Sequence, residues 1–225
     1  LGVGLIGGSL ALCFKGRPGV RVVGHSPRPE SIRRYIERGV VDEGTTSLEE
    51  AARDADFLFL CVPVGLIGEY LERLSRCPLK PGAVITDVGS TKSGVMAEAA
   101  RHSFGEAVFI GGHPMAGKER SGVEAATSAL FVNAYYVLTP AENTPPAALD
   151  ALAELLSATR AKLIVMDART HDEIVGAVSH LPHIVAALLV NLVARLNRTN
   201  DKYEQLAAGG FRDTTRIASG DPGLW

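Results

Sequence analysis

Short apolar runs alternate with segments of helical spacing over most of the chain. The run FLFLCV, which Pro63 ends, is uninterrupted, and such runs are typical of parallel strands that are buried on both faces. We predict strands at residues 20–25, 57–62, 83–88, 108–111, 134–138 and 162–166, and helices at residues 29–38, 64–74, 93–101 and 146–156. This alternation predicts βαβ units and an α/β fold with a doubly wound, mostly parallel sheet.

The pattern changes near Asp167. Residues 170–196 form one long, strongly apolar segment with helical spacing, interrupted only at Leu181-Pro182, and no predicted strand follows it. Helices that are apolar on all sides are buried in a domain core or against a second subunit. We therefore predict an α/β domain over residues 1–167 and an all-helical domain over residues 168–225, which we expect to be incomplete at its C-terminal end.

The composition is that of an ordinary soluble globular protein, with 225 residues, 46% hydrophobic and 21% charged. A formal net charge of −2 offers no basic surface for nucleic acid. No uninterrupted apolar run reaches the roughly 18 residues that span a bilayer, so we expect no membrane association. Cys13, Cys61 and Cys77 are odd in number and lack the spacing of metal ligands. We expect reduced thiols, no bound metal and a cytoplasmic location.

Gly2, Gly4 and Gly7 form a G-x-G-x-x-G motif that leads directly into a helix-forming segment. In a Rossmann-type fold the first glycine makes a tight turn, the second lets the backbone approach a pyrophosphate, and the third lets the helix pack on the strand. The helix N-terminus then favours the phosphates of a dinucleotide. We predict that Gly4, Leu5, Ile6 and Gly7 bind the cofactor, although glycines at this spacing also occur in ordinary turns.

Leu1 stands directly before the first motif glycine. Most of the strand that normally precedes this turn is therefore not in the sequence. Because that strand lies at the centre of the sheet, we expect the chain to be part of a longer one.

The second signal for the cofactor is the end of the strand at residues 20–25. An acidic residue about 20 positions after the glycines usually binds the ribose hydroxyls of NAD. Here Ser26 occupies that region and Arg28 follows it. A hydroxyl and a guanidinium suit the 2′-phosphate of NADP, so these residues favour NADP over NAD as the cofactor. The alternative is that Arg28 is a solvated loop residue that does not bind the cofactor. We also place Val62, Pro63 and Ser90 among the cofactor-binding residues.

His113 is the strongest catalytic candidate, in the segment GGHPMAGKE that follows a predicted strand. Ligands of open α/β sheets bind at the carboxyl ends of strands. A neutral imidazole there can accept a proton from an alcohol during hydride transfer, and Ser90, at the end of the preceding strand, can orient the ring. The alternative is a histidine that caps a turn. In the helical part, His180 and His183 either face a cleft or make structural hydrogen bonds, and an arginine of GGFRDTTRIA can clamp a carboxylate.

Taken together, the chain resembles the prephenate/arogenate dehydrogenase family of tyrosine biosynthesis. The resemblance runs through five ordered motifs: GLIGGSLA, DVGSTKS, GGHPMAGKERSGVEAA, HDEIVGAVSHLPHIVAALL and GGFRDTTRIASGDPGLW. It implies an NAD(P)-dependent oxidoreductase that oxidatively decarboxylates prephenate to 4-hydroxyphenylpyruvate, and a homodimer built through the helical domain.

The resemblance also implies roles for individual residues. His113 hydrogen-bonds the hydroxyl of the substrate ring, and Ser90 supports His113 next to the nicotinamide. Arg216 binds the ring carboxylate, and His183 lines the side-chain end of the substrate. Further substrate-site residues are Asp213 and Asp172, as acidic partners of Arg216, and Trp225.

Three alternatives stay open from the sequence. Arogenate differs from prephenate only at the side chain, where His183 favours prephenate. A non-catalytic dinucleotide sensor leaves His113, Ser90 and Arg216 without a purpose. A dehydrogenase for small β-hydroxy acids shares the two-domain plan, but it normally needs a lysine on the long helix, and residues 170–196 contain none.

Overall fold

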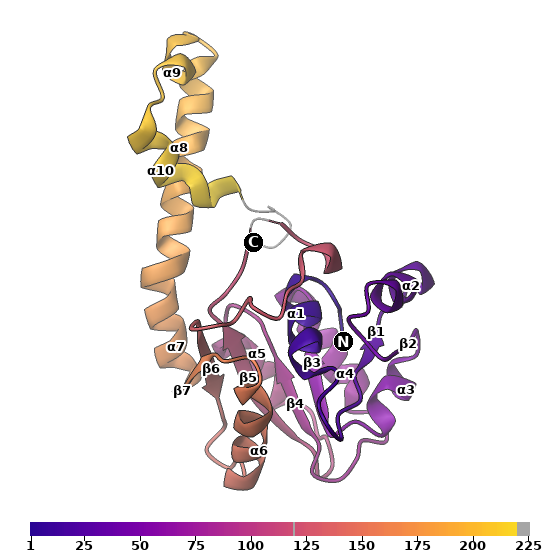
Figure 1. Cartoon of the computed structure of the whole chain (residues 1–225). Helices are drawn as coiled ribbons and strands as arrows, with labels where there is room; N and C mark the ends of the chain where they lie inside the picture. Colours follow the sequence, from indigo (N-terminus) through magenta and orange to yellow (C-terminus); the bar gives the residue numbers. More distant parts are fainter. Residues whose placement is uncertain (119, 220–225) are drawn as a thin grey trace. The chain divides into compact units, whose positions relative to one another are not determined.

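The structure is a computed structural model that describes residues 1–118 and 120–219 (Figure 1). The chain divides into two compact units. The first runs from Leu1 to His171 and the second begins at Asp172, so the boundary lies inside one helix, α7 (Ala168–Val175).

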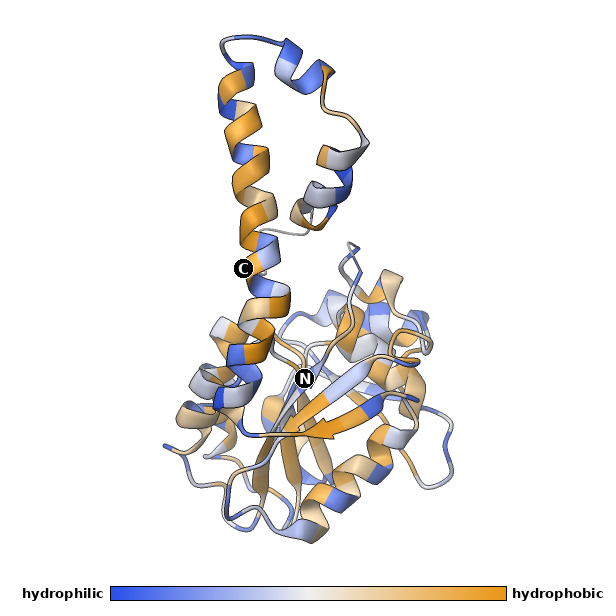
Figure 2. Ribbon diagram, turned by 90° about the vertical axis from the view of Figure 1, so that its left-hand side faces the viewer, coloured by the Kyte–Doolittle hydropathy of each residue, from blue (hydrophilic) through white to orange (hydrophobic). Residues whose placement is uncertain are grey.

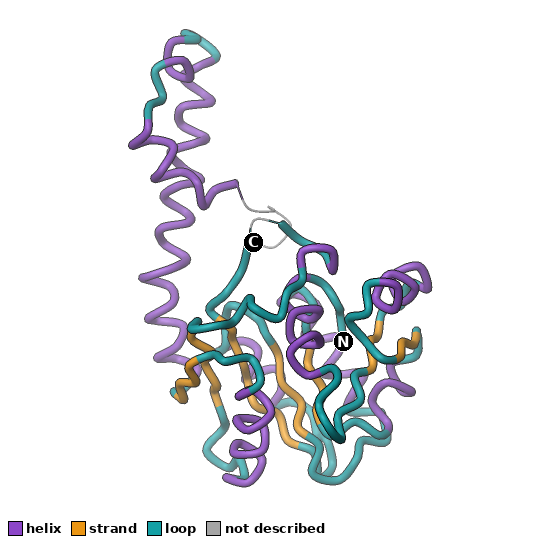
Figure 3. The backbone as a smooth tube through the Cα atoms, in the orientation of Figure 1, coloured by secondary structure: helices purple, strands orange, loops and turns teal. Residues whose placement is uncertain are grey.

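The strands of the first unit form a two-stranded and a five-stranded sheet, flanked by helices (Figure 3). They are β1 (Val23–His25), β2 (Glu43–Thr45), β3 (Phe57–Leu60), β4 (Val84–Asp87), β5 (Val108–Pro114), β6 (Tyr135–Thr139) and β7 (Lys162–Val165). The larger sheet has the order β3-β4-β5-β6-β7. Of its pairs, β5–β6 is antiparallel and the other three are parallel, as is β1–β2. The predicted mostly parallel α/β sheet is thus confirmed.

Leu1 and Gly2 lie between the two sheets and hydrogen-bond to both. The Leu1 nitrogen donates to the carbonyl of Phe59 at 2.8 Å, and the Cys61 amide donates to the carbonyl of Leu1 at 2.8 Å. The Gly2 amide donates to the carbonyl of His25 at 3.1 Å. A cavity of about 400 Å³ is lined by Leu1 and Gly2 together with Val20–Val23 and Phe57–Phe59.

Helices cover both faces of the sheet. They are α1 (Leu5–Phe14), α2 (Pro29–Glu37), α3 (Leu48–Arg53), α4 (Val64–Leu74), α5 (Ser93–Ala99), the 3-10 helix η1 (Val123–Ala125), α6 (Pro146–Ser157) and α7. Side chains alternate between two cores. Ile85 and Phe109 pack with α3, α4 and α5, while Val84 and Ile110 pack with α1 and α6. Successive side chains of β4 and β5 point to opposite faces of the sheet, so the fold has three layers: helices, sheet and helices.

Local signals account for several helix ends. Ser47 accepts a hydrogen bond from the Glu50 amide at 3.1 Å and so caps α3. Helix α4 begins directly after Pro63 and spans the predicted residues. The structure differs at β5, which was predicted to end at residue 111 but continues through His113 to Pro114. The reason is that Gly112 to Pro114 pair with β6 in antiparallel register.

The second unit is helical. It contains the π-helical turn η2 (Gly176–His180), α8 (Leu181–Asn197), α9 (Lys202–Gln205), α10 (Gly209–Thr215) and the 3-10 helix η3 (Arg216–Ser219). The interruption expected at Leu181-Pro182 is the π turn η2, which ends at His180. Pro182 has no amide hydrogen and so cannot continue the hydrogen-bond ladder of a single helix. Helices α9, α10 and η3 all pack against α8. Asn197 fixes α9 through its contacts with the side chain and amide of Glu204, at 3.0 and 3.1 Å.

Apolar residues run along the long helix (Figure 2), and many of their side chains are exposed. They include Ile174, Val178, Leu181, Ile184, Val185, Leu188 and Leu192. The helix Ala168–Asn197 has 30 residues and a mean hydropathy of 1.7 over its most apolar window, so it meets the length and composition of a membrane span. The sequence argument missed this because scattered Ser, His and Asn residues break every uninterrupted apolar run while the average stays high. A buried core helix of a soluble protein meets the same criterion, so the finding by itself is weak evidence for a membrane.

Candidate active site

The glycine motif adopts the conformation that dinucleotide binding requires. Gly2 has a φ of +83°, and a Cβ on it would lie 2.6 Å from the Cys61 carbonyl oxygen. A Cβ on Gly7 would lie 2.2 Å from the Gly2 carbonyl oxygen, so only glycine allows α1 to pack this closely. At Gly4, by contrast, a Cβ would meet nothing within 4 Å. Gly2 therefore makes the tight turn, Gly4 leaves room for a phosphate to approach the backbone, and Gly7 allows the close contact of α1.

The N-terminus of α1 is free to accept an anion. Gly4 is its N-cap, no side chain caps the helix, and its first turn contains no acidic residue. The amides of Leu5 and Ile6, in this first turn, therefore have the orientation and partial charge that bind phosphate. These observations fit a dinucleotide pyrophosphate.

Cys61 lies against this turn but has no sign of reactivity. Burial raises the pKa of its thiol to about 11. It therefore remains protonated at neutral pH and packs as an apolar side chain. The thiols of Cys13, Cys61 and Cys77 are all free.

The other predicted cofactor residues follow the carboxyl ends of parallel strands. Ser26 and Arg28 follow β1, Val62 and Pro63 follow β3, and Ser90 follows β4. Ser26 is buried and its hydroxyl oxygen accepts a hydrogen bond from the Arg28 amide at 3.3 Å, while the Arg28 side chain is exposed. This turn therefore carries an exposed arginine two residues after a buried serine, at the carboxyl end of β1.

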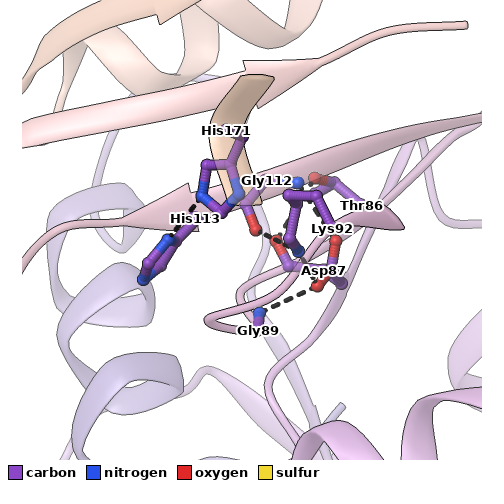
Figure 4. A network of polar contacts seen from close by, with 7 residues as sticks. All are labelled: Thr86, Asp87, Gly89, Lys92, Gly112, His113 and His171. Atoms are coloured by element: carbon purple, nitrogen blue, oxygen red, sulfur yellow. Dashed lines mark hydrogen bonds and ion pairs between the residues drawn. The ribbon is translucent and has the colours of Figure 1, made fainter. Parts of the chain in front are cut away.

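His113 lies in β5, opposite Val137 of β6, and is 9% exposed. Its Nδ1 is 2.8 Å from Nε2 of His171, which is fully buried in the first turn of α7 (Figure 4). The two ring centroids are 5.1 Å apart and the ring planes meet at 70°. The imidazole of His113 is thus held at one nitrogen by a residue 58 positions away in the chain.

A buried ion pair joins the ends of β4 and β5. Asp87 and Lys92 are both fully buried and contact each other directly (Figure 4). Asp87 also accepts hydrogen bonds from the amides of Gly89 at 2.8 Å and Gly112 at 3.0 Å. Lys92 donates to the carbonyl of Gly112 at 2.8 Å. These contacts fix the loop that carries Ser90 relative to the strand that carries His113.

Two glycines before His113 are required by this packing. A Cβ on Gly112 would lie 2.6 Å from the Asp87 carbonyl oxygen, and one on Gly111 would lie 2.3 Å from Oγ1 of Thr139. Any side chain there would push β4, β5 or β6 apart. The GGHP sequence therefore places His113 next to the buried ion pair.

Ser90 was expected to orient the His113 ring. Within residues 1–118 and 120–219, Ser90 makes no hydrogen bond to His113, whose Nδ1 instead contacts His171. Ser90 is exposed at the carboxyl end of β4. Its contact with cofactor or substrate stays a prediction.

The remaining predicted residues belong to the second unit. His183 is half-buried near the start of α8, Asp213 is exposed on α10, and Arg216 is exposed at the start of η3, which packs on α8. Asp172 is the first residue of the unit. Trp225 lies outside the described residues.

Sequence reasoning missed His171, Asp87 and Lys92 as parts of the site. His171 offered a signal, because it is a histidine in a segment with strong helical periodicity. Lys92 offered none, since a lysine at the start of a short helix is ordinarily exposed.

The fold and the site define a class: proteins with a Rossmann-type nucleotide-binding domain followed by a helical domain. The family model described as "Prephenate dehydrogenase, nucleotide-binding domain" matches residues 10–165, and the one described as "Prephenate dehydrogenase, dimerization domain" matches residues 167–225. The chain belongs to the prephenate dehydrogenase family.

Individual relatives agree with the family models. Prephenate dehydrogenase of Bacillus subtilis (strain 168) is 40% identical over 225 residues, covering 100% of this chain and 61% of the relative. The structure of prephenate dehydrogenase from Aquifex aeolicus in complex with hydroxyphenyl propionate and NAD+ matches with a TM-score of 0.90 and 36% identity, covering 100% of this chain and 78% of that one. Synechocystis arogenate dehydrogenase matches with a TM-score of 0.82 and 39% identity, covering 99% and 79%. The chain spans 61% to 62% of the length of the first two curated relatives.

Proposed function

We propose that this chain carries the catalytic machinery of an NAD(P)-dependent prephenate dehydrogenase, which converts prephenate to 4-hydroxyphenylpyruvate and carbon dioxide. The observation that carries the proposal is the position of His113. It lies at the carboxyl end of β5, which pairs with β4, the strand that Ser90 follows, in a chain of the prephenate dehydrogenase family.

In this proposal His113 handles the proton. A bound oxidised dinucleotide would supply the acceptor for the hydride of the hydroxyl-bearing ring carbon. His113 accepts the hydroxyl proton as the carbon–oxygen bond gains double-bond character. Loss of carbon dioxide from the opposite carbon returns an electron pair to the ring, and His113 gives its proton back to the resulting phenolate. The ring becomes aromatic and His113 ends in its starting state.

The polar ends of the substrate are assigned to the second unit. Arg216 binds the ring carboxylate by charge-assisted hydrogen bonds, with Asp213 and Asp172 as its acidic partners. His183 contacts the side-chain end of the substrate, and Trp225, which lies outside the described residues, is a further substrate-binding residue in this proposal. The guanidinium has to hold the carboxylate in place and still release it as carbon dioxide.

Arogenate is the second candidate substrate. The similarity of this chain to Synechocystis arogenate dehydrogenase is the reason to retain arogenate as a candidate substrate. The two substrates differ in carrying a keto or an amino group on the side chain. The imidazole of His183 can donate an N–H hydrogen bond to the keto oxygen, and this supports prephenate.

NADP is the proposed dinucleotide, with NAD as the alternative. The exposed Arg28 guanidinium and the Ser26 hydroxyl follow β1 where an acidic residue would select NAD. Arginine binds a 2′-phosphate through paired hydrogen bonds, whereas a carboxylate repels it. The unpaired Cys13, Cys61 and Cys77 suit a cytoplasmic enzyme.

A homodimer is proposed for the assembly. The exposed apolar side chains of α8 lie in the region that matches the dimerization model. Covering them with the same face of a second copy buries the apolar surface that a lone subunit leaves in water.

The deciding experiment is a spectrophotometric assay of reduced-cofactor formation by the full-length protein. It uses four pairings: prephenate or arogenate, each with NAD or NADP. We expect the highest kcat/KM with prephenate and NADP, and carbon dioxide released one-to-one with reduced cofactor. A higher kcat/KM with arogenate would replace prephenate as the proposed substrate, and a higher kcat/KM with NAD would replace NADP as the proposed cofactor. If no pairing produces reduced cofactor, the proposed function is rejected.

A further inference from the structure

The geometry points to His171 as a positioning residue for His113. We infer that Nε2 of His171 accepts a hydrogen bond from the Nδ1 hydrogen of His113, and that this bond keeps the Nε2 lone pair of His113 available to the reacting hydroxyl. The inference rests on the proposed function for its catalytic consequence, but the proton position itself is a property of the unliganded protein.

The contact is short and enclosed. The two nitrogens are 2.8 Å apart, and the ring planes meet at 70°. His171 is fully buried and His113 is 9% exposed. In such an enclosed position the hydrogen bond has little competition from water, so it favours one proton distribution of the two rings over the other.

His171 is itself held firmly by the start of α7. Its amide donates to the Asp167 carbonyl at 3.0 Å, and the Asp167 side chain accepts from the Thr170 amide at 2.9 Å. The hydrogen bonds from Thr170 hold the pKa of Asp167 below its usual value, so this cap stays ionised at neutral pH. Ser93 ties the same turn to α5 through the carbonyl of Ala168 at 3.3 Å. The ring of His171 is therefore presented from a fixed helix end.

Two lone pairs cannot face each other at this separation, so one proton lies between the two nitrogens. If the proton belongs to His113, the other nitrogen of that ring, Nε2, is an acceptor and can take the substrate proton. If it belongs to His171, a neutral His113 carries its proton on Nε2 and can only donate there. The chemistry proposed for His113 requires the first arrangement.

A histidine partner, which carries no negative charge, also suits a residue that takes up a proton and returns it. A carboxylate beside an imidazole strongly stabilises the charged ring. The imidazole of His171 accepts the same hydrogen bond without a full negative charge. His113 can therefore become charged as the hydroxyl loses its proton and still give that proton to the phenolate.

The direct test is the tautomer of His113, measured by NMR. Full-length protein labelled with nitrogen-15 in histidine is examined without cofactor, using two-bond correlations between ring hydrogens and nitrogens. His113→Asn assigns the signals. We expect Nδ1 of His113 to be protonated and Nε2 to be unprotonated in the wild-type protein. An Nε2-protonated His113 in the wild-type protein overturns the inference, whatever the activity.

Two substitutions separate positioning from packing. His171→Gln keeps a side-chain acceptor near the former Nε2 position, whereas His171→Leu removes it. We expect His171→Leu to shift His113 towards the Nε2-protonated form and to lower kcat by about 10- to 100-fold, the range for a misplaced proton acceptor. The KM for the dinucleotide should be unchanged. We expect His171→Gln to recover most of kcat, to within about fivefold of wild type.

The controls make each result decisive. His102→Leu removes a histidine whose contact is Glu98 at 3.2 Å, outside the site, and should leave kcat unchanged. Equal losses in His171→Gln and His171→Leu would overturn the positioning role. If the wild-type protein reduces no dinucleotide with prephenate or arogenate, the proposed function fails, while the NMR result still decides the proton position.

Discussion

Lys92 and Asp87 form a fully buried ion pair, and both residues also bond to Gly112 of the neighbouring strand. The pair therefore joins β4 to β5 just before His113. A buried charge is costly unless it is paired and hydrogen-bonded, and here the contacts satisfy the carboxylate on both oxygens. The arrangement makes the position of the candidate catalytic histidine dependent on an ion pair that water does not reach.

Removing one partner of this pair should destabilise the protein strongly. We expect Lys92→Met to lower the free energy of unfolding by about 3–5 kcal/mol, because it leaves the Asp87 carboxylate buried without a countercharge. Chemical denaturation of the full-length protein measures the change. The matched control is Lys80→Met, which breaks the exposed pair with Asp56 and should cost less than about 1 kcal/mol. Equal changes in the free energy of unfolding in the two variants would show that the buried pair stabilises the protein no more than the exposed pair does.

Stability should also depend on pH through His25. Burial, foremost, lowers the pKa of this imidazole to about 4. The N-terminal amino group and Arg73 act in the same direction, while a backbone hydrogen bond at Thr46 and the charge of Glu49 oppose it. The unfolded chain binds a proton near the ordinary histidine pKa of about 6.5, while the folded protein does not until about pH 4. The contribution of His25 to stability is therefore present above pH 6.5 and is lost as the pH falls towards 4.

The slope of this loss is at most about 1.4 kcal/mol per pH unit. Urea denaturation at several pH values between 4 and 7 measures it. In His25→Gln the dependence over this window should be flatter, since the titrating group is gone. A variant with the same pH dependence as the wild-type protein would assign the titration to other groups.

Much of the fold could be predicted from the sequence because short segments of neighbouring residues determine it. The apolar run ending at Pro63 predicted β3, and Pro63 itself fixed the start of α4. The glycine turn could be predicted as well, because Gly2 and Gly7 occupy positions where a Cβ would clash with backbone atoms.

The parts that escaped prediction depend on contacts between distant segments. His171 and His113 are 58 positions apart, so only the packing of α7 against β5 shows that they share a hydrogen bond. Lys92 has the sequence context of a surface lysine, and its burial follows from Asp87 and Gly112 lying beside it. The extension of β5 through Pro114 likewise depends on the pairing partner, β6.

The apolar surface of α8 should hold two copies together. Leu188 is 62% exposed and lies in the middle of this helix. We expect Leu188→Glu to convert the dimer to a monomer, because a carboxylate in an apolar interface is strongly unfavourable. Sedimentation equilibrium measures the mass. Lys202→Glu, on the exposed polar helix α9, is the control and should stay dimeric. A wild-type protein that is monomeric at micromolar concentration would contradict the dimer.

Arg216 should matter for substrate and not for cofactor. We expect Arg216→Ala to raise the KM for prephenate about 30- to 150-fold, which corresponds to the 2–3 kcal/mol of a charge-assisted contact to a carboxylate. The KM for the dinucleotide should change little. Arg212→Ala, on α10 in the same segment, is the matched control. If Arg212→Ala raises the KM for prephenate and Arg216→Ala does not, the carboxylate is held by the other arginine.

In the proposed mechanism His113 moves the substrate proton during an oxidative decarboxylation. Its most direct test is the turnover number of His113→Asn with prephenate, measured beside the dinucleotide affinity of the same variant. The account predicts a loss of kcat of about 100-fold or more with dinucleotide binding close to wild type. A variant that binds dinucleotide normally and turns over prephenate at the wild-type rate would contradict it.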